Sequence, residues 1–147
     1  YRFSELQLII TGRLIPRKGH HFILEIMPDL IREFPNLSLV VLGNGELENK
    51  LKEQASTLNI DNSVHFLGFQ SDVNQYLKSS DLMVVTSYSE GLPFVIFEAF
   101  NAKTPVITFD TIGSNELVIN DKTGVVVPAF NKKQFTKSSS NPSSDGA

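Results

Sequence analysis

The feature that most constrains the fold is a repeated alternation of short apolar runs with helical segments. The runs are rich in Leu, Ile and Val and are bounded by glycines or small polar residues, as is typical of buried β-strands. The six predicted strands are Leu6–Thr11, Leu37–Leu42, 64–67, Leu82–Val85, Val106–Phe109 and Gly124–Val127. Between them, apolar residues recur at helical spacing, and the predicted helices are 22–34, 47–58, 72–77, 94–102 and 114–119.

Strands that are apolar on both faces and alternate with helices indicate a parallel sheet with helices on each side. Right-handed crossovers then build a doubly wound, Rossmann-like α/β domain of about six strands, which we expect to occupy residues 1–130. Ligands bind at the carboxyl ends of the strands in this architecture. The loops at which we expect a ligand therefore begin at Gly12, Gly43, Gly68, Thr86 and Asp110.

Composition excludes several classes of protein. The 147 residues carry 13 basic and 16 acidic side chains, a net charge of −3, so no global basic excess favours a nucleic-acid partner. The chain has no cysteine, which removes disulfides and thiolate metal sites and fits a reducing, cytoplasmic compartment. No apolar run approaches the ~18 residues of a membrane-spanning helix.

Both ends of the chain are distinctive. It starts at Tyr1-Arg2-Phe3, with neither an initiator methionine nor a signal peptide, which suggests a piece cut from a longer protein. Residues 136–147 contain five serines and no apolar residue larger than alanine. Such a segment buries too little apolar surface to offset the conformational entropy lost on folding, so we expect 131–147 to form a flexible tail.

The first loop, residues 12–19, concentrates positive charge. Arg13, Arg17 and Lys18 lie between Gly12 and Gly19, where the glycines let the backbone approach an anion and the cations supply charge and donors. A solvated basic turn is the alternative and stays open. The Walker phosphate-binding pattern is absent.

Two adjacent histidines follow this loop. His20 and His21 would face different sides of a helix and no third ligand lies at useful spacing, so packing or surface histidines are favoured over a metal site. We expect no metal.

The second loop, Gly43-Asn44-Gly45-Glu46, lacks the third glycine of a dinucleotide fingerprint because Glu48 occupies that position. A tight turn with a helix cap is the favoured interpretation there.

The stretch 86–99 carries the most information. Pro93 fits a first helical turn, so we expect a helix to start nearby, with the N–H groups of Phe94 and Val95 free to bind an anion or polar ligand. Glu90 precedes the helix, and Glu98 lies within it among apolar neighbours. If Glu98 is buried, its carboxylate needs a hydrogen-bond partner, and the two hydroxyls of a ribose would be suitable. An equally favoured alternative is that Glu98 reaches solvent at the edge of the helix. A hydrolytic pair of acids is disfavoured because nothing marks one as the proton donor.

These motifs together resemble the carboxyl-terminal half of the group 1 glycosyltransferases, retaining family 4 enzymes with the GT-B fold. The resemblance runs from about Ile9 to Pro128. It is carried in order by Gly12-Arg13, Arg17-Lys18-Gly19, Glu90-Gly91-Leu92-Pro93, Glu98-Ala99, Thr104-Pro105-Val106-Ile107, Gly113-Ser114-Asn115-Glu116 and Thr123-Gly124. One departure is Lys103-Thr104, where the family often has a small residue before the Pro-Val pair.

The resemblance implies roles for individual residues. Arg13 and Lys18 would hold the diphosphate of a nucleotide-sugar, with Gly12 beside them, and would stabilise the departing charge without a divalent metal or other cofactor. Glu90 would contact the transferred sugar and Glu98 the ribose. The remaining implied contacts are the base-lining loop Leu67-Gly68-Phe69 and the backbone amides of Gly91, Leu92, Phe94 and Val95.

The function that the resemblance implies is the donor-binding half of a hexosyltransferase that retains configuration, with a UDP- or GDP-linked sugar as donor. An amino-terminal GT-B domain with the acceptor site would be the missing partner, so the isolated chain should be inactive. Bacterial envelope polysaccharide synthesis fits, with the full-length enzyme in the cytoplasm or peripheral to the inner membrane. A non-catalytic nucleotide-binding module, or half of a sugar-nucleotide epimerase, are the alternatives.

Overall fold

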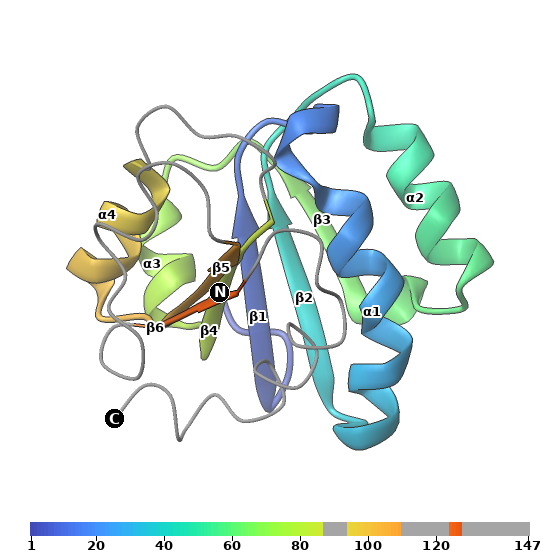
Figure 1. Ribbon diagram of the computed structural model, residues 1–147, viewed down its shortest axis with the longest axis horizontal. Helices are drawn as coiled ribbons and strands as arrows, with labels where there is room; N and C mark the ends of the chain where they lie inside the picture. The colour runs from blue at the N-terminus through green and yellow to red at the C-terminus, as the bar shows by residue number, and fades with distance from the viewer. Residues whose placement is uncertain (87–93, 110–123, 128–147) are drawn as a thin grey trace.

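The computed structural model describes residues 1–86, 94–109 and 124–127. Within them lies a six-stranded parallel sheet with the order β3-β2-β1-β4-β5-β6, which confirms the predicted doubly wound α/β architecture (Figure 1). The strands are β1 (Leu6–Thr11), β2 (Leu37–Leu42), β3 (Val64–Gly68), β4 (Leu82–Val85), β5 (Val106–Phe109) and β6 (Gly124–Val127). The predicted helix at 114–119 and the predicted tail at 131–147 lie outside the described residues.

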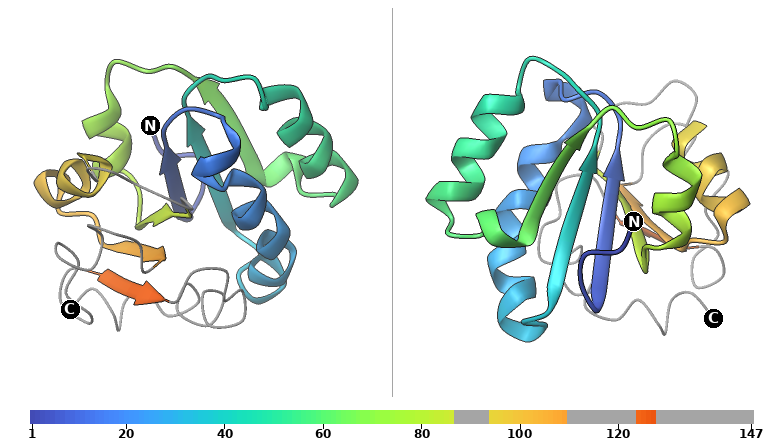
Figure 2. Two further views of the ribbon diagram at one scale, coloured as in Figure 1. Left: turned by 45° about the horizontal axis from the view of Figure 1, so that its top comes forward. Right: turned by 180° about the vertical axis from the view of Figure 1, so that it is seen from behind.

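The helices form two layers, one on each face of the sheet. α1 (His20–Glu33) and α2 (Glu48–Thr57) cover one face, whereas α3 (Val73–Lys78) and α4 (Phe94–Ala102) cover the other (Figures 1 and 2). Two short 3₁₀ helices, η1 (Pro16–Lys18) and η2 (Asp61–Ser63), precede α1 and β3. No helix within the described ranges is both long enough and apolar enough to cross a membrane.

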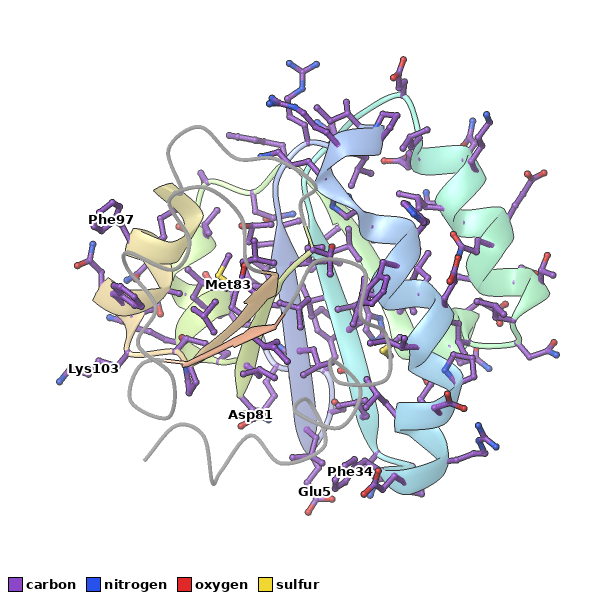
Figure 3. The ribbon with its side chains drawn as sticks, viewed as in Figure 1. Glu5, Phe34, Asp81, Met83, Phe97 and Lys103 are labelled. Atoms are coloured by element: carbon purple, nitrogen blue, oxygen red, sulfur yellow. The ribbon has the colours of Figure 1, made fainter. Side chains whose placement is uncertain are left out.

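Each layer has its own hydrophobic core, because alternate side chains of a strand point to opposite faces. Ile10, Val41 and Ile23 belong to the cluster under α1 and α2. Ile9 and Met83 belong to the cluster under α3 and α4, and Met83 lies in the middle of the molecule (Figure 3). The central strands are thus apolar on both sides, which is why their sequences read as continuous apolar runs.

Parallel pairing places all strand carboxyl ends at one edge of the sheet. β1 pairs in register with β2 from Leu6↔Leu37 to Thr11↔Leu42, and the loops that leave these strands lie at the top of Figure 1. The opposite edge is marked by Glu5, Phe34 and Asp81 at the bottom of Figure 3. The cationic loop after β1 and the loops after β2 and β3 therefore meet at a single edge.

Candidate functional site at the carboxyl edge of the sheet

Three loops at the carboxyl edge are joined by backbone hydrogen bonds. Gly12 N donates to Leu42 O at 3.1 Å, and Leu14 N donates to Asn44 O at 2.9 Å. Gly43 N donates in turn to Gly68 O at 2.8 Å. The bonds tie the loop after β1 to the loop after β2, and that loop to the end of β3. They hold the segment that carries Arg13 in place beside the other two loops.

Glycine is required where these loops cross. A Cβ atom on Gly43 would lie 2.0 Å from Gly12 O, and its φ of +133° is a conformation that other residues rarely adopt. The helix cap that was predicted for residues 43–46 is wrong, because α2 begins at Glu48 with Leu47 as its N-cap and without a side-chain capping bond. The glycine-rich turn serves instead to let two backbones pass closely.

A pocket of about 450 Å³ opens above these loops. It is formed by the ends of β1, β2 and β3 together with α3 and α4. Four of the residues predicted from the sequence line it: Gly12, Arg13, Phe69 and Glu98. The other lining residues are Thr11, Leu42, Gly43, Asn44, Gly45, Gln70 and Val73. Tertiary structure thus brings together residues from Thr11 to Glu98, which lie far apart in the chain.

The cationic loop forms one side of the pocket. Arg13 is exposed, and among the described residues no salt bridge joins its guanidinium to a carboxylate. Lys18 ends η1, and its Cδ and Cε atoms lie close to Gly12, 3.8 Å from where a Cβ would stand. Arg13 and Lys18 are therefore both positioned by the loop that starts at Gly12. Of the three cations in this loop, Arg13 lines the pocket, whereas Arg17 and Lys18 are not among the lining residues.

Thr86, at the end of β4, anchors the cationic loop. Its buried hydroxyl lies 2.8 Å from Gly19 O and 3.1 Å from Lys18 O, so these two carbonyl oxygens share its single O–H donor. A Cβ at Gly19 would lie 2.1 Å from Thr86 O, so this contact also requires glycine. The sequence placed Thr86 at the start of a candidate loop but assigned its side chain no role, although a threonine directly after a buried strand was a signal for one.

Glu98 enters the pocket from α4. It is the fifth residue of the helix, and although its side chain is exposed, burial raises the pKa of its carboxyl group above the usual value. Glu98 therefore lies at a solvated helix edge, which was one of the two interpretations, and it also lines the pocket. Its contact with a ribose stays a prediction. Its neighbour Phe97 points away from the sheet (Figure 3).

The loop after β3 forms the far side of the pocket. Phe69 is 75% exposed, which is unusual for so large an apolar side chain. Leu67 packs instead against the cluster under α3 and α4, and its carbonyl oxygen accepts a hydrogen bond from Gln70 Nε2 at 2.9 Å. Of the two residues predicted to line the base, Phe69 is among the pocket's lining residues and Leu67 is not.

The start of α4 lies at the same edge of the sheet. The helix begins at Phe94, next to the predicted start at Pro93, and its first N–H groups have no partner within the helix. Phe94 and Val95 are thus the first two residues of the helix, as expected. The other residues predicted for this part of the site, Glu90, Gly91 and Leu92, lie outside the described residues.

The two histidines differ in their surroundings. His20 is 3% exposed, and neither ring nitrogen has a hydrogen-bond partner within the described part of the chain. Burial, with smaller contributions from Lys18 and His21, lowers the pKa of His20 to about 4. His20 is therefore a neutral packing residue, as favoured from the sequence. Among the residues that the structure describes, no group of three possible metal ligands is found.

Comparison with known proteins identifies the family. The sequence profile of the group 1 glycosyl transferases matches residues 4–141. The chain belongs to this family. It is 39% identical over 120 residues to an uncharacterized glycosyltransferase of Methanocaldococcus jannaschii, covering 78% of this chain and 30% of that protein. It is 34% identical over 121 residues to the Escherichia coli UDP-Gal:alpha-D-GlcNAc-diphosphoundecaprenol alpha-1,3-galactosyltransferase, covering 80% of this chain and 31% of that protein.

Solved structures show the same fold. The glycosyltransferase WaaG, involved in lipopolysaccharide biosynthesis, matches with a TM-score of 0.85 at 25% identity, over 94% of this chain and 38% of that chain. Anabaena HepE in complex with UDP matches with a TM-score of 0.83 at 25% identity, over 91% of this chain and 38% of that chain. The group 1 glycosyltransferase chain spans about a third of the length of the curated relatives it matches. It corresponds to their carboxyl-terminal GT-B domain.

Proposed function

We propose that this chain is the donor-binding domain of a retaining hexosyltransferase and that a UDP- or GDP-linked sugar occupies the pocket at the carboxyl edge. The observation that carries the proposal is the composition of that pocket, which joins the guanidinium of Arg13, the carboxylate of Glu98 and the exposed ring of Phe69. These are a cation for phosphate, an acceptor for a diol and an aromatic surface for a base. The Anabaena neighbour in complex with UDP supports a nucleotide ligand.

Arg13 and Lys18 act on the leaving group in this proposal. Breaking the bond between sugar and diphosphate builds negative charge on the outer phosphate. Cations fixed in one loop stabilise that charge more strongly in the transition state than in the ground state, and so lower the barrier. The anchored backbone between Gly12 and Gly19 helps here, because charges held in place need little reorganisation. We expect no divalent metal to be needed, so EDTA should leave nucleotide binding unchanged.

Glu98 and the residues before α4 hold the rest of the donor. The Glu98 carboxylate accepts hydrogen bonds from the two ribose hydroxyls, a pairing that compensates its partial burial. Glu90 contacts the transferred sugar, and the amides of Gly91, Leu92, Phe94 and Val95 bind its hydroxyls and the phosphate. Phe69 contacts the base.

The acceptor site and the complete activity are assigned to an amino-terminal GT-B domain. The curated relatives are about three times as long as the matched region, and in a GT-B enzyme the site lies between two domains. The isolated chain is then expected to bind donor without transferring sugar. Synthesis of envelope polysaccharide, in the cytoplasm or at the inner membrane, is proposed from the name of the Escherichia coli relative, whose substrate is linked to diphosphoundecaprenol.

Titration calorimetry with UDP, GDP and ADP tests donor binding. At least one of these should bind, and Arg13→Ala or Lys18→Ala should weaken it by about tenfold or more, the value of one charge-assisted hydrogen bond. Lys50→Ala is the matched control, because Lys50 is exposed on α2, away from the pocket residues. If no nucleoside diphosphate or nucleotide-sugar binds, the proposal fails.

A transfer assay separates the enzyme from a non-catalytic module of the same fold. The chain would be joined to the amino-terminal domain of a close relative and supplied with donor and acceptor. A transferase should be active and should lose activity on Glu90→Gln while still binding nucleotide. A binding module would show nucleotide affinity without transfer in either form.

A further inference from the structure

Gln70 lines the same pocket and its amide group has a defined orientation. Its Nε2 donates to the backbone carbonyl oxygen of Leu67 at 2.9 Å. A carbonyl oxygen can only accept, so the NH₂ group of the amide must be the anchored end. The anchor does not use Oε1, which keeps its capacity to accept a hydrogen bond. Turning the amide over would sacrifice the bond to Leu67.

Gln70 lies at the end of the pocket opposite the cationic loop. It follows β3, whereas Arg13 follows β1, and β2 lies between these strands. Two strand spacings separate the two ends by roughly 10 Å. If phosphates bind at Arg13, the base of a nucleotide lies toward Phe69 and Gln70. The flat, exposed ring of Phe69 gives such a base a surface to stack on.

We propose that Gln70 is a specificity-determining residue that selects a base with a ring N–H. Its Oε1 accepts from N3–H of uracil or N1–H of guanine. Cytosine and adenine have an acceptor nitrogen at the corresponding ring position, so two acceptors would face each other and Oε1 would lose its partner. The inference rests on the proposed nucleotide site and adds the residue that would distinguish the bases.

The expected discrimination is about tenfold or more, because an unpaired acceptor in a partly desolvated site costs at least as much as a hydrogen bond contributes. The anchor makes this discrimination possible. A free glutamine could present either end of its amide and would accommodate all four bases. Gln70 is held by Leu67 and presents its oxygen.

Calorimetric titration of the full chain with UDP against CDP, and with GDP against ADP, tests the inference. Within each pair the phosphates and ribose are identical. We expect UDP to bind about tenfold or more tightly than CDP, or GDP than ADP if the pocket takes a purine. Gln70→Met, which keeps the length of the side chain and removes the amide, should reduce that ratio to near one.

Gln54→Met is the matched control. Gln54 also donates from Nε2 to a backbone carbonyl, His21 O at 3.0 Å, but it lies on α2 and does not line the pocket. Its variant should keep the wild-type ratio. The inference is overturned if CDP and ADP bind as tightly as their partners, or if Gln70→Met preserves the preference. Binding of none of the four would overturn the proposed function itself.

Discussion

The backbones of Gly43 and Gly12 pass so closely that no side chain fits between them. A Cβ at Gly43 would lie 2.0 Å from the carbonyl oxygen of Gly12 and 2.9 Å from its carbonyl carbon. This contact joins the ends of β2 and β1 at the floor of the pocket. The position of Arg13, directly after Gly12, depends on it.

Gly43→Ala should therefore destabilise the fold and weaken nucleotide binding together. Both the clash and the positive φ contribute, and we expect the free energy of unfolding to fall by about 2 kcal/mol or more. Urea denaturation and calorimetry measure the two effects. Gly12→Ala is the control for backbone strain alone, because φ is +126° there but a Cβ would meet only Lys18 carbons at 3.8 Å. Equal losses in the two variants would contradict the close-approach argument.

Thr86→Val removes the hydroxyl that anchors the cationic loop and keeps the shape of the side chain. Loss of a buried hydrogen bond should lower the free energy of unfolding by about 1 kcal/mol. Nucleotide affinity should also fall, because Lys18 and Gly19 lose a shared donor. Thr104→Val removes a comparable buried bond, to Leu77 O at 2.7 Å, away from the pocket. It should lower stability without changing affinity, and an equal loss of affinity in both variants would refute the anchoring role.

His20 should make the protein less stable in mild acid. Its folded-state pKa of about 4 lies below the unfolded value of 6.5, so only the unfolded chain gains a proton as the pH falls below 6.5. Between pH 7 and pH 5 the free energy of unfolding should drop by about 2 kcal/mol from this group. Denaturant unfolding of His20→Leu should show a correspondingly smaller drop. An equal drop in the wild type and in His20→Leu would contradict the assignment of this acid sensitivity to the buried ring of His20.

Glu98→Gln should weaken nucleotide binding and reduce its dependence on pH. Burial raises the pKa of the Glu98 carboxyl, so the charged acceptor is lost at a higher pH than for an ordinary glutamate. As the pH falls through that pKa, the affinity of the wild type should approach that of the variant. Glu46→Gln, at an exposed position on the loop after β2, is the control. A constant ratio of the two affinities from pH 7 to pH 4 would contradict the role of Glu98.

Much of the fold could be predicted because local pattern and burial coincide. β1, β2, β4, β5 and β6 have the predicted bounds, and β3 extends one residue further, to Gly68. These strands are short runs of β-branched and aliphatic residues between glycines or polar residues, so their ends are marked in the sequence. α1 and α2 could likewise be predicted, because their apolar residues recur at helical spacing.

The site could be predicted only in part. Charge and glycine spacing identified the cationic loop, and Arg13, Phe69 and Glu98 do line one pocket. The same spacing gave no sign that Gly43 lies against Gly12, because close approach of two backbones depends on how strands pair. The roles of the Thr86 and Gln70 side chains were missed because each acts through a hydrogen bond to a backbone carbonyl, and such a bond leaves no pattern in the sequence.

The element order, the parallel sheet and the kinds of chemical group at its carboxyl edge could all be predicted from the amino-acid sequence. These follow from side-chain periodicity and residue type, which are local properties. Three features became evident from the folded structure: which of those groups share a pocket, which glycines let two loops approach closely, and that His20 is buried and neutral. Those outcomes depend on distances between residues far apart in the chain, and packing sets such distances only after the strands have paired.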